Sequence, residues 1–190
     1  MRRFVTVVTG LPRSGTSLAM QMLRAGGIPL LADERRAPDA DNPRGYFEYE
    51  PVRRLARDAG WMAEAVGRAV KVVAPLARHL PPGFEYRVLL VRRDLAEVIA
   101  SQERMLARRG EPNAGGLAPE RLAAVLAAQL AETAAFFARS AGVRTLPLEH
   151  AALLRDPAAA AAAIDAFLGG GLDRAAMCAV VEPALHRERR

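Results

Sequence analysis

The sequence contains one cysteine, Cys178, and one lysine, Lys71, among 190 residues. A lone cysteine excludes an internal disulfide and a multi-cysteine metal site, and it fits a reducing compartment, so we expect a cytoplasmic protein. Aromatic residues make up 5% of the chain, which leaves no evident stacking platform for nucleic acid. We find no run near the ~18 consecutive apolar residues that cross a bilayer, and we expect no stable membrane insertion.

The charge of the chain is positive and almost entirely arginine. Lys plus Arg number 27 against 21 Asp plus Glu, which leaves a formal net charge of +6. This excess favours an anionic partner without choosing among a nucleic acid, an anionic surface and a phosphorylated small molecule. The length and the 51% hydrophobic content predict one domain over residues 1–190 with a single ordinary core.

An apolar run near the N-terminus leads into a glycine-containing loop. Val5 to Val8 suit a buried parallel strand, and Gly10 and Gly15 allow tight turns before a helix that begins near Thr16. Unpaired N–H groups at such a helix start form an anion site. The stretch therefore predicts a strand, a phosphate-binding loop and a helix.

The rest of the chain repeats the alternation of strands and helices. This alternation predicts an α/β fold of three layers, with a central parallel sheet between helices. Together with the glycine-containing loop, this arrangement resembles the fold of the P-loop nucleotide hydrolases. Ligands of such sheets bind beyond the carboxyl ends of the strands. The later predicted strands cover residues 69–74, 86–91 and 143–148, and the predicted helices cover residues 16–25, 51–67, 95–108, 120–140, 150–154 and 157–168.

The glycine spacing of the first loop matches a nucleoside-triphosphatase P-loop, but its chemistry differs. Thr16 stands where that motif needs the lysine that reaches the β- and γ-phosphates, which disfavours an ATPase or a kinase. A cation lies inside the loop instead, at Arg13. The run Arg13-Ser14-Gly15-Thr16-Ser17 resembles the 5′-phosphosulfate loop of the sulfotransferase family, whose members bind 3′-phosphoadenosine 5′-phosphosulfate (PAPS).

Two further segments strengthen the resemblance. Arg93-Asp94, with Ser101 eight residues after Arg93, resembles the family's element for the 3′-phosphate of the donor. A guanidinium and a hydroxyl at this spacing can converge on one anion, because the helix brings Ser101 back over its own first turns. The segment from Asn42 to Glu48 resembles the Asn-Pro-basic-Gly-Tyr-aromatic-Glu segment of bacterial sulfotransferase-like proteins.

The resemblance implies which residues bind the donor. They would be Arg93 and Ser101 at the 3′-phosphate, and Pro12, Arg13, Ser14, Gly15, Thr16 and Ser17 at the 5′-phosphosulfate. PAPS would be the co-substrate, adenosine 3′,5′-bisphosphate (PAP) the product, and no metal is expected. Arg13 would neutralise charge on the leaving phosphate, a role it shares with the cations of phosphoryl transfer.

Fewer residues in the sequence point to the binding site of the acceptor. Lys71 stands where cytosolic sulfotransferases have the lysine of a Lys-Thr-His-Leu-Pro segment, but the position of the family's catalytic histidine is Val73. Lys71 is expected to contact the transferred group or the leaving oxygen. Glu48 is our candidate for the base that removes the acceptor's proton, and Glu50, His79 and His150 are alternatives.

These observations predict a sulfotransferase that moves a sulfuryl group from PAPS to a hydroxyl or amine of a small molecule or glycan. A catalytically degenerate relative that binds PAP or another polyanion is the second hypothesis, because Val73 replaces the histidine. A P-loop nucleotide kinase is the third. The irregular segments from Ile28 to Tyr49 and from Arg109 to Pro119 are expected to surround the acceptor.

Overall fold

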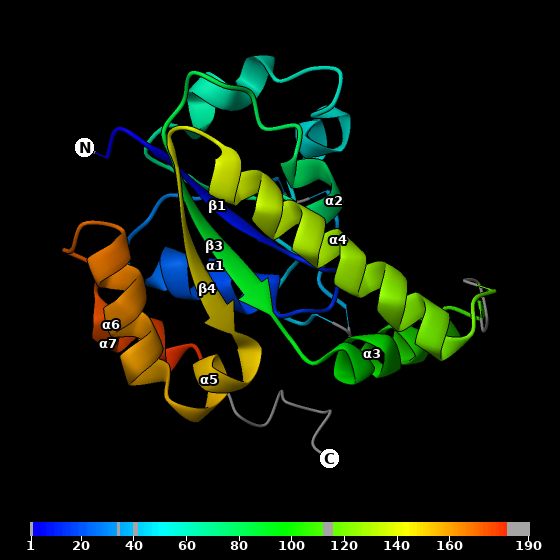
Figure 1. Cartoon of the computed structure of the whole chain (residues 1–190). Helices are drawn as coiled ribbons and strands as arrows, with labels where there is room; N and C mark the ends of the chain where they lie inside the picture. The colour runs from blue at the N-terminus through cyan, green and yellow to red at the C-terminus, as the bar shows by residue number, and fades with distance from the viewer. Residues whose placement is uncertain (1, 34, 40–41, 112–115, 182–190) are drawn as a thin grey trace.

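A parallel sheet forms the centre of the molecule (Figure 1). The computed structural model describes residues 2–33, 35–39, 42–111 and 116–181. The strands stand in the order β2 (Ala69–Lys71), β1 (Val5–Gly10), β3 (Tyr86–Arg92) and β4 (Val143–Glu149), and all neighbours are parallel. Their register brings the ends of all four strands to one edge. The predicted parallel sheet is thus confirmed.

Helices cover both faces of the sheet, which confirms the three-layer α/β architecture (Figure 1). One face carries α1 (Thr16–Ala25), α5 (His150–Arg155), α6 (Pro157–Phe167) and α7 (Arg174–Ala179). The other carries two 3-10 helices, η1 (Glu50–Arg54) and η2 (Gly60–Ala65), together with α2 (Ala74–Ala77) and α4 (Pro119–Arg139). Helix α3 (Leu95–Arg108) follows β3 and packs against α4.

Alternation along the strands explains the two cores. In β1, Val5 and Val7 join the cluster around Trp61, whereas Val8 joins the cluster around Met20 of α1. Side chains of a strand point to opposite faces in turn, so a run of apolar residues fits a strand that is buried on both faces. Each of these three valines has an exposed fraction of 0%. The buried β1 therefore fixes where the loop after it begins.

The predicted helix over residues 51–67 is wrong. The segment forms η1 and η2 instead, and they are interrupted near Gly60, whose backbone N–H donates to Asp58 Oδ1 at 2.9 Å. Glycine and the local Asp58 contact favour a turn over a continuous helix. The strand predicted over residues 69–74 ends at Lys71, because α2 begins at Ala74 with a proline in its first turn.

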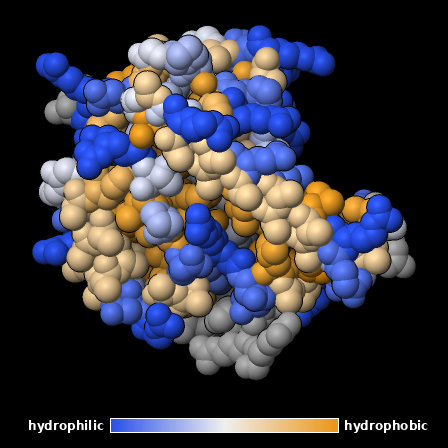
Figure 2. Space-filling model, in the orientation of Figure 1, coloured by the Kyte–Doolittle hydropathy of each residue, from blue (hydrophilic) through white to orange (hydrophobic). Residues whose placement is uncertain are grey.

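Helix α4 is long and apolar enough to cross a membrane by length and composition alone, contrary to our expectation for every segment. Its many alanines raise the mean hydropathy although polar residues interrupt the run. Figure 2 shows apolar residues along this helix on the visible face. In the fold, α4 packs against α2, α3 and β4, which is the position of a helix that covers a sheet.

Candidate active site

The loop after β1 has the conformation that an anion site requires. Gly10 approaches the backbone of β3 so closely that a Cβ there would lie 2.5 Å from the Val91 carbonyl oxygen. Arg13 and Gly15 both adopt positive φ, 70° and 98°, and α1 starts with no side-chain cap on its first N–H groups. These N–H groups and the positive end of the helix dipole favour a phosphate at this position.

Helix α3 and the turn before it are tied to this phosphate loop (residues 11–15) by hydrogen bonds. Arg13 Nε donates to Ser101 Oγ at 3.0 Å, and Arg93 Nη1 donates to the Arg13 carbonyl oxygen at 3.1 Å. Arg93 also pairs with Glu97 at 2.8 Å, and its side chain is 9% exposed. The residues that the two motifs single out therefore lie together, although 80 residues separate Arg13 from Arg93.

The start of α3 explains how Arg93 and Ser101 reach the loop. Asp94 caps the helix by accepting a hydrogen bond from the backbone N–H of Glu97 at 3.1 Å. This cap fixes the first turn next to the end of β3, and Ser101 follows on the same side of the helix as the phosphate loop. Ser101 is 5% exposed, so the helix holds its hydroxyl in a shielded position.

On the opposite side of β1, Lys71 ends β2 and faces the beginning of α1. Its Nζ donates to the Tyr46 carbonyl oxygen and to Ser17 Oγ, the latter at 3.5 Å. Asn42 Nδ2 donates to the same Ser17 oxygen at 2.8 Å. Burial lowers the pKa of the Lys71 ammonium to about 8, an effect that the nearby Glu48 partly offsets and Arg36 increases.

The irregular segment 28–49, which we call the long loop, is held in place by specific contacts. Its start runs beside β2, where the Leu31 N–H donates to the Ala69 carbonyl oxygen at 2.8 Å. Arg44 Nη1 donates to the Val180 carbonyl oxygen at 2.7 Å, and the Tyr46 hydroxyl donates to Asp39 at 2.7 Å. The loop is therefore a wall of the site and is built against the sheet edge.

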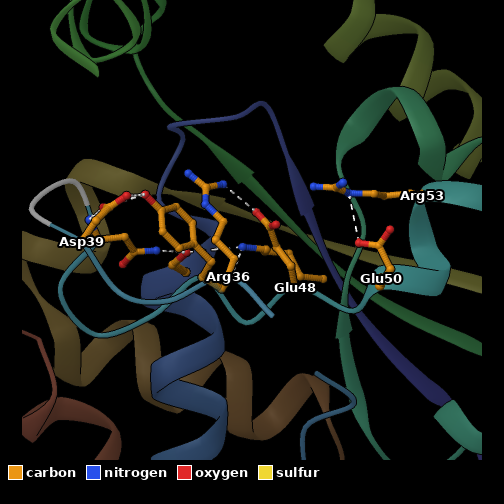
Figure 3. A network of polar contacts seen from close by, with 9 residues as sticks. Arg36, Asp39, Glu48, Glu50 and Arg53 are labelled. Atoms are coloured by element: carbon orange, nitrogen blue, oxygen red, sulfur yellow. Dashed lines mark hydrogen bonds and ion pairs between the residues drawn. The ribbon is translucent and has the colours of Figure 1, made fainter. Parts of the chain in front are cut away.

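The long loop also carries an ion pair that faces the site (Figure 3). Arg36 Nη1 lies 3.1 Å from Glu48 Oε1, and both side chains are 34% exposed. The Arg36 guanidinium lies 3.3 Å from the centroid of the Tyr46 ring. Glu50, in contrast, pairs with Arg53 at 3.4 Å and lies at a separate, smaller hollow beside Arg35.

These elements enclose a cavity of about 430 Å³. Its lining includes residues predicted for the donor and for the acceptor. Arg13, Arg93 and Ser101 belong to the first set, and Lys71 and Glu48 belong to the second. Pro12, Gly15, Thr16 and Ser17 also line it, whereas the Ser14 hydroxyl is buried against Gly10. Among the residues that the structure describes, the cations of its lining are Arg13, Arg36, Lys71, Arg93, Arg104, Arg108 and Arg109, and the carboxylate is Glu48.

The two histidine alternatives fall in different places. His79 follows α2, outside the cavity, and accepts a hydrogen bond from Arg78 Nε at 3.4 Å. His150 begins α5 and lines the cavity next to the phosphate loop, so close that a Cβ on Gly15 would lie 2.3 Å from its Cδ2. Its position after β4 is the signal that could have placed it at the site, since the ends of parallel strands share one edge.

Other cavity residues were not predicted from the sequence. Arg36 and Asn42 reach the site from the long loop. Arg104 and Arg108 reach it from the second half of α3, and Arg109 reaches it from the residue after the helix. These arginines follow Ser101 at intervals of three, seven and eight residues, and this helical spacing is a signal that was present in the sequence. Of the second segment expected around the acceptor, residues 112–115 lie outside the described part of the chain.

The fold is similar to those of solved bacterial sulfotransferases. The alignment with the structure of a sulfotransferase from Alicyclobacillus acidocaldarius covers 100% of this chain and 98% of the Alicyclobacillus chain, with a TM-score of 0.55 and 17% sequence identity. The chain has the sulfotransferase fold. The alignment with the sulfotransferase domain of the Synechococcus PCC 7002 olefin synthase covers 97% of this chain and 86% of that domain's chain, with a TM-score of 0.58 and 16% sequence identity.

The alignment with a third sulfotransferase structure, from Mycobacterium avium, covers 100% of this chain and 69% of the Mycobacterium chain, with a TM-score of 0.56 and 16% sequence identity. No protein-family model and no curated protein matched the sequence in our searches. The similarity therefore lies in the sulfotransferase fold, and the chemistry of this chain has to be argued from its own residues.

Proposed function

We propose that the protein is a sulfotransferase that uses PAPS as the donor and transfers its sulfuryl group to a hydroxyl or amine. The observation that carries the proposal is the joining of the phosphate loop to α3, where Arg13 donates to Ser101 and Arg93 donates to the Arg13 backbone. Two cations and a hydroxyl thus lie next to the uncapped start of α1. A ligand with two separated phosphate groups matches this arrangement.

The roles follow from position and charge. Arg93 and Ser101 would hold the 3′-phosphate, and the N–H groups at Thr16 and Ser17 would hold the 5′-phosphate. Ser17 Oγ accepts from Asn42 and Lys71, which leaves its own hydrogen to donate to a ligand oxygen. Arg13 would stabilise the charge that develops on the leaving phosphate.

The transfer step itself needs a proton acceptor near the nucleophile. The acceptor oxygen or nitrogen forms a bond to sulfur, and the bond from sulfur to the bridging oxygen breaks with its electron pair going to the 5′-phosphate of PAP. The acceptor's proton goes to the Glu48 carboxylate, which lines the cavity near Lys71. Lys71 would donate to an oxygen of the group in transit.

A binding protein without catalysis is the second candidate. Val73 lines the cavity at the position that resembles the family's catalytic histidine, and valine cannot move a proton. This candidate shares the whole donor site with the enzyme, so donor binding alone does not separate the two. A nucleotide kinase would instead require magnesium-dependent binding of ATP or GTP, and Thr16 offers no lysine for their phosphates.

Calorimetry followed by a transfer assay tests the proposal. We expect PAP to bind at least about tenfold more tightly than adenosine 5′-monophosphate, because only PAP reaches both Arg93 and the phosphate loop. Transfer of ³⁵S from labelled PAPS to an acceptor would then establish the enzyme. Binding of PAP without any transfer or sulfate release would favour the binding protein, and equal affinity for the two nucleotides would contradict both.

A further inference from the structure

Arg36 is a cation of the cavity to which the proposed donor gives no role. It lies in the long loop, on the β2 side of β1, whereas Arg93 and Ser101 lie on the β3 side. Lys71 and Tyr46 are its neighbours there. A donor held between the phosphate loop and α3 has its 3′-phosphate on the far side of β1, so Arg36 faces the space left for the acceptor.

The structure fixes this guanidinium in place. It lies over the Tyr46 ring at 3.3 Å from the centroid, and the Tyr46 hydroxyl donates to both carboxylate oxygens of Asp39 at 2.7 Å. A stacked arginine loses less freedom when it binds a ligand than a flexible side chain does. Arg36 is therefore a preorganised cation.

Arg36 also has unused hydrogen-bonding capacity. A guanidinium carries five N–H donors, and Glu48 takes one of them through the contact of Oε1 with Nη1 at 3.1 Å. Both side chains are 34% exposed, so the pair is open to a ligand. A second anion can bind the remaining donors in the two-pronged manner that arginine favours.

We infer that the acceptor is an anionic molecule, with a carboxylate, phosphate or sulfate group that binds Arg36 close to the hydroxyl or amine that is sulfated. This inference rests on the proposed function and adds the chemical class of the acceptor. This group binds the N–H donors of Arg36 that the contact with Glu48 leaves over, next to the Glu48 carboxylate that takes the acceptor's proton. An acceptor without the anion lacks this second attachment beside the base.

Matched pairs of probes test the inference in the protein saturated with PAP. The probes are 4-hydroxyphenylacetate with 4-hydroxyphenylacetamide, and methyl glucuronide with methyl glucuronamide, in which a carboxylate and an amide of similar size alternate. Calorimetry on the wild-type complex should show the carboxylate of at least one pair binding about tenfold more tightly than its amide, as a hydrogen-bonded charge pair provides.

Two variants locate the effect. Arg36→Gln should abolish the preference for the carboxylate and leave the PAP affinity within about twofold, because Arg36 does not reach the donor's phosphates. Arg53→Gln is the matched control, since this arginine pairs with Glu50 in the same region (Figure 3) but does not line the cavity. It should retain the full preference.

The outcomes separate the inference from the function on which it rests. If PAP binds and neither carboxylate is preferred, or if Arg36→Gln keeps the preference, the anionic acceptor is wrong while the donor site stands. If PAP fails to bind the wild-type protein, both the proposed function and the inference that rests on it are wrong. Circular dichroism of Arg36→Gln should match the wild type, and Arg36→Lys should restore part of the preference because it keeps the charge without the fork.

Discussion

The two sides of the cavity are built by different means. On the β3 side, the phosphate loop and α3 follow directly from buried strands. Two arginine side chains there donate to a serine hydroxyl and to a backbone carbonyl oxygen near the strand ends. On the β2 side, the long loop has little regular structure, and its position depends on Asn42 and Arg44, which reach distant partners, and on the bond from Tyr46 to Asp39 within the loop. Contacts at buried strand ends suit the proposed nucleotide site, and a side made of loop contacts suits the proposed acceptor site.

The largest effect is expected at Arg13, and it tests whether the β3 side of the cavity contributes to catalysis. Arg13→Ala should lower the turnover of sulfuryl transfer by about 100-fold or more, the effect of removing a preorganised group that stabilises developing charge. Steady-state kinetics with labelled PAPS measures this. Arg57→Ala, which removes an exposed arginine outside the cavity, serves as the control. Unchanged turnover in Arg13→Ala would remove this residue from the mechanism.

The β2 side is tested by its carboxylates. Glu48→Gln should lower turnover by about 100-fold with little change in the affinity for PAP, because it removes the base and keeps the size of the side chain. Glu50→Gln is the matched control, since Glu50 pairs with Arg53 away from the cavity. If Glu48→Gln keeps its activity at the normal pH optimum, the base lies elsewhere, and His150 becomes the next candidate to test.

Much of the β3 side could be predicted from the sequence because its signals are local. The glycine spacing and the eight-residue interval from Arg93 to Ser101 set positions within one turn or one helix. The alternation of strands and helices also sufficed for the parallel sheet. A strand end specifies where its next residues lie, so local patterns carried over to the site.

The β2 side could be predicted only in part. Glu48 was singled out, but its pairing with Arg36 depends on a turn of the long loop that has no periodic pattern. Likewise, the helix predicted over residues 51–67 failed because Gly60 and the packing of Trp61 decide the local conformation there. Such contacts join residues through tertiary structure, and sequence spacing does not encode them directly.

A pair of glycines compares the stiffness of the two sides. Gly15→Ala should destabilise the protein by at least about 2 kcal/mol, because it adds the cost of a positive φ to an overlap with His150. Gly45→Ala, in the long loop, has a similar φ of 95° but no neighbour within 4 Å among the described atoms, so we expect about 1 kcal/mol. Chemical denaturation measures both free energies of unfolding.

The double variant Gly15→Ala with His150→Ala separates the two costs at Gly15. Removing the imidazole of His150 should relieve the overlap, so His150→Ala should destabilise the protein less in the Gly15→Ala background than in the wild type. Equal effects of His150→Ala in both backgrounds would mean that the overlap is not what makes glycine necessary. Equal losses in Gly15→Ala and Gly45→Ala would mean that the phosphate loop is no stiffer than the long loop.

Lys71 joins the two sides, and its titration gives the smallest effect. Its pKa of about 8 in the empty cavity should rise when the polyanion PAP binds nearby, because a negative charge favours the ammonium form. Binding above pH 8 then takes up a proton, so the association constant should fall by up to about tenfold per pH unit there and by only about twofold between pH 7 and 8. Calorimetry in buffers of different ionisation enthalpy measures this uptake directly. Lys71→Arg keeps a permanent charge and should bind PAP without pH dependence over this range, and the same decline in that variant would assign the proton to another group.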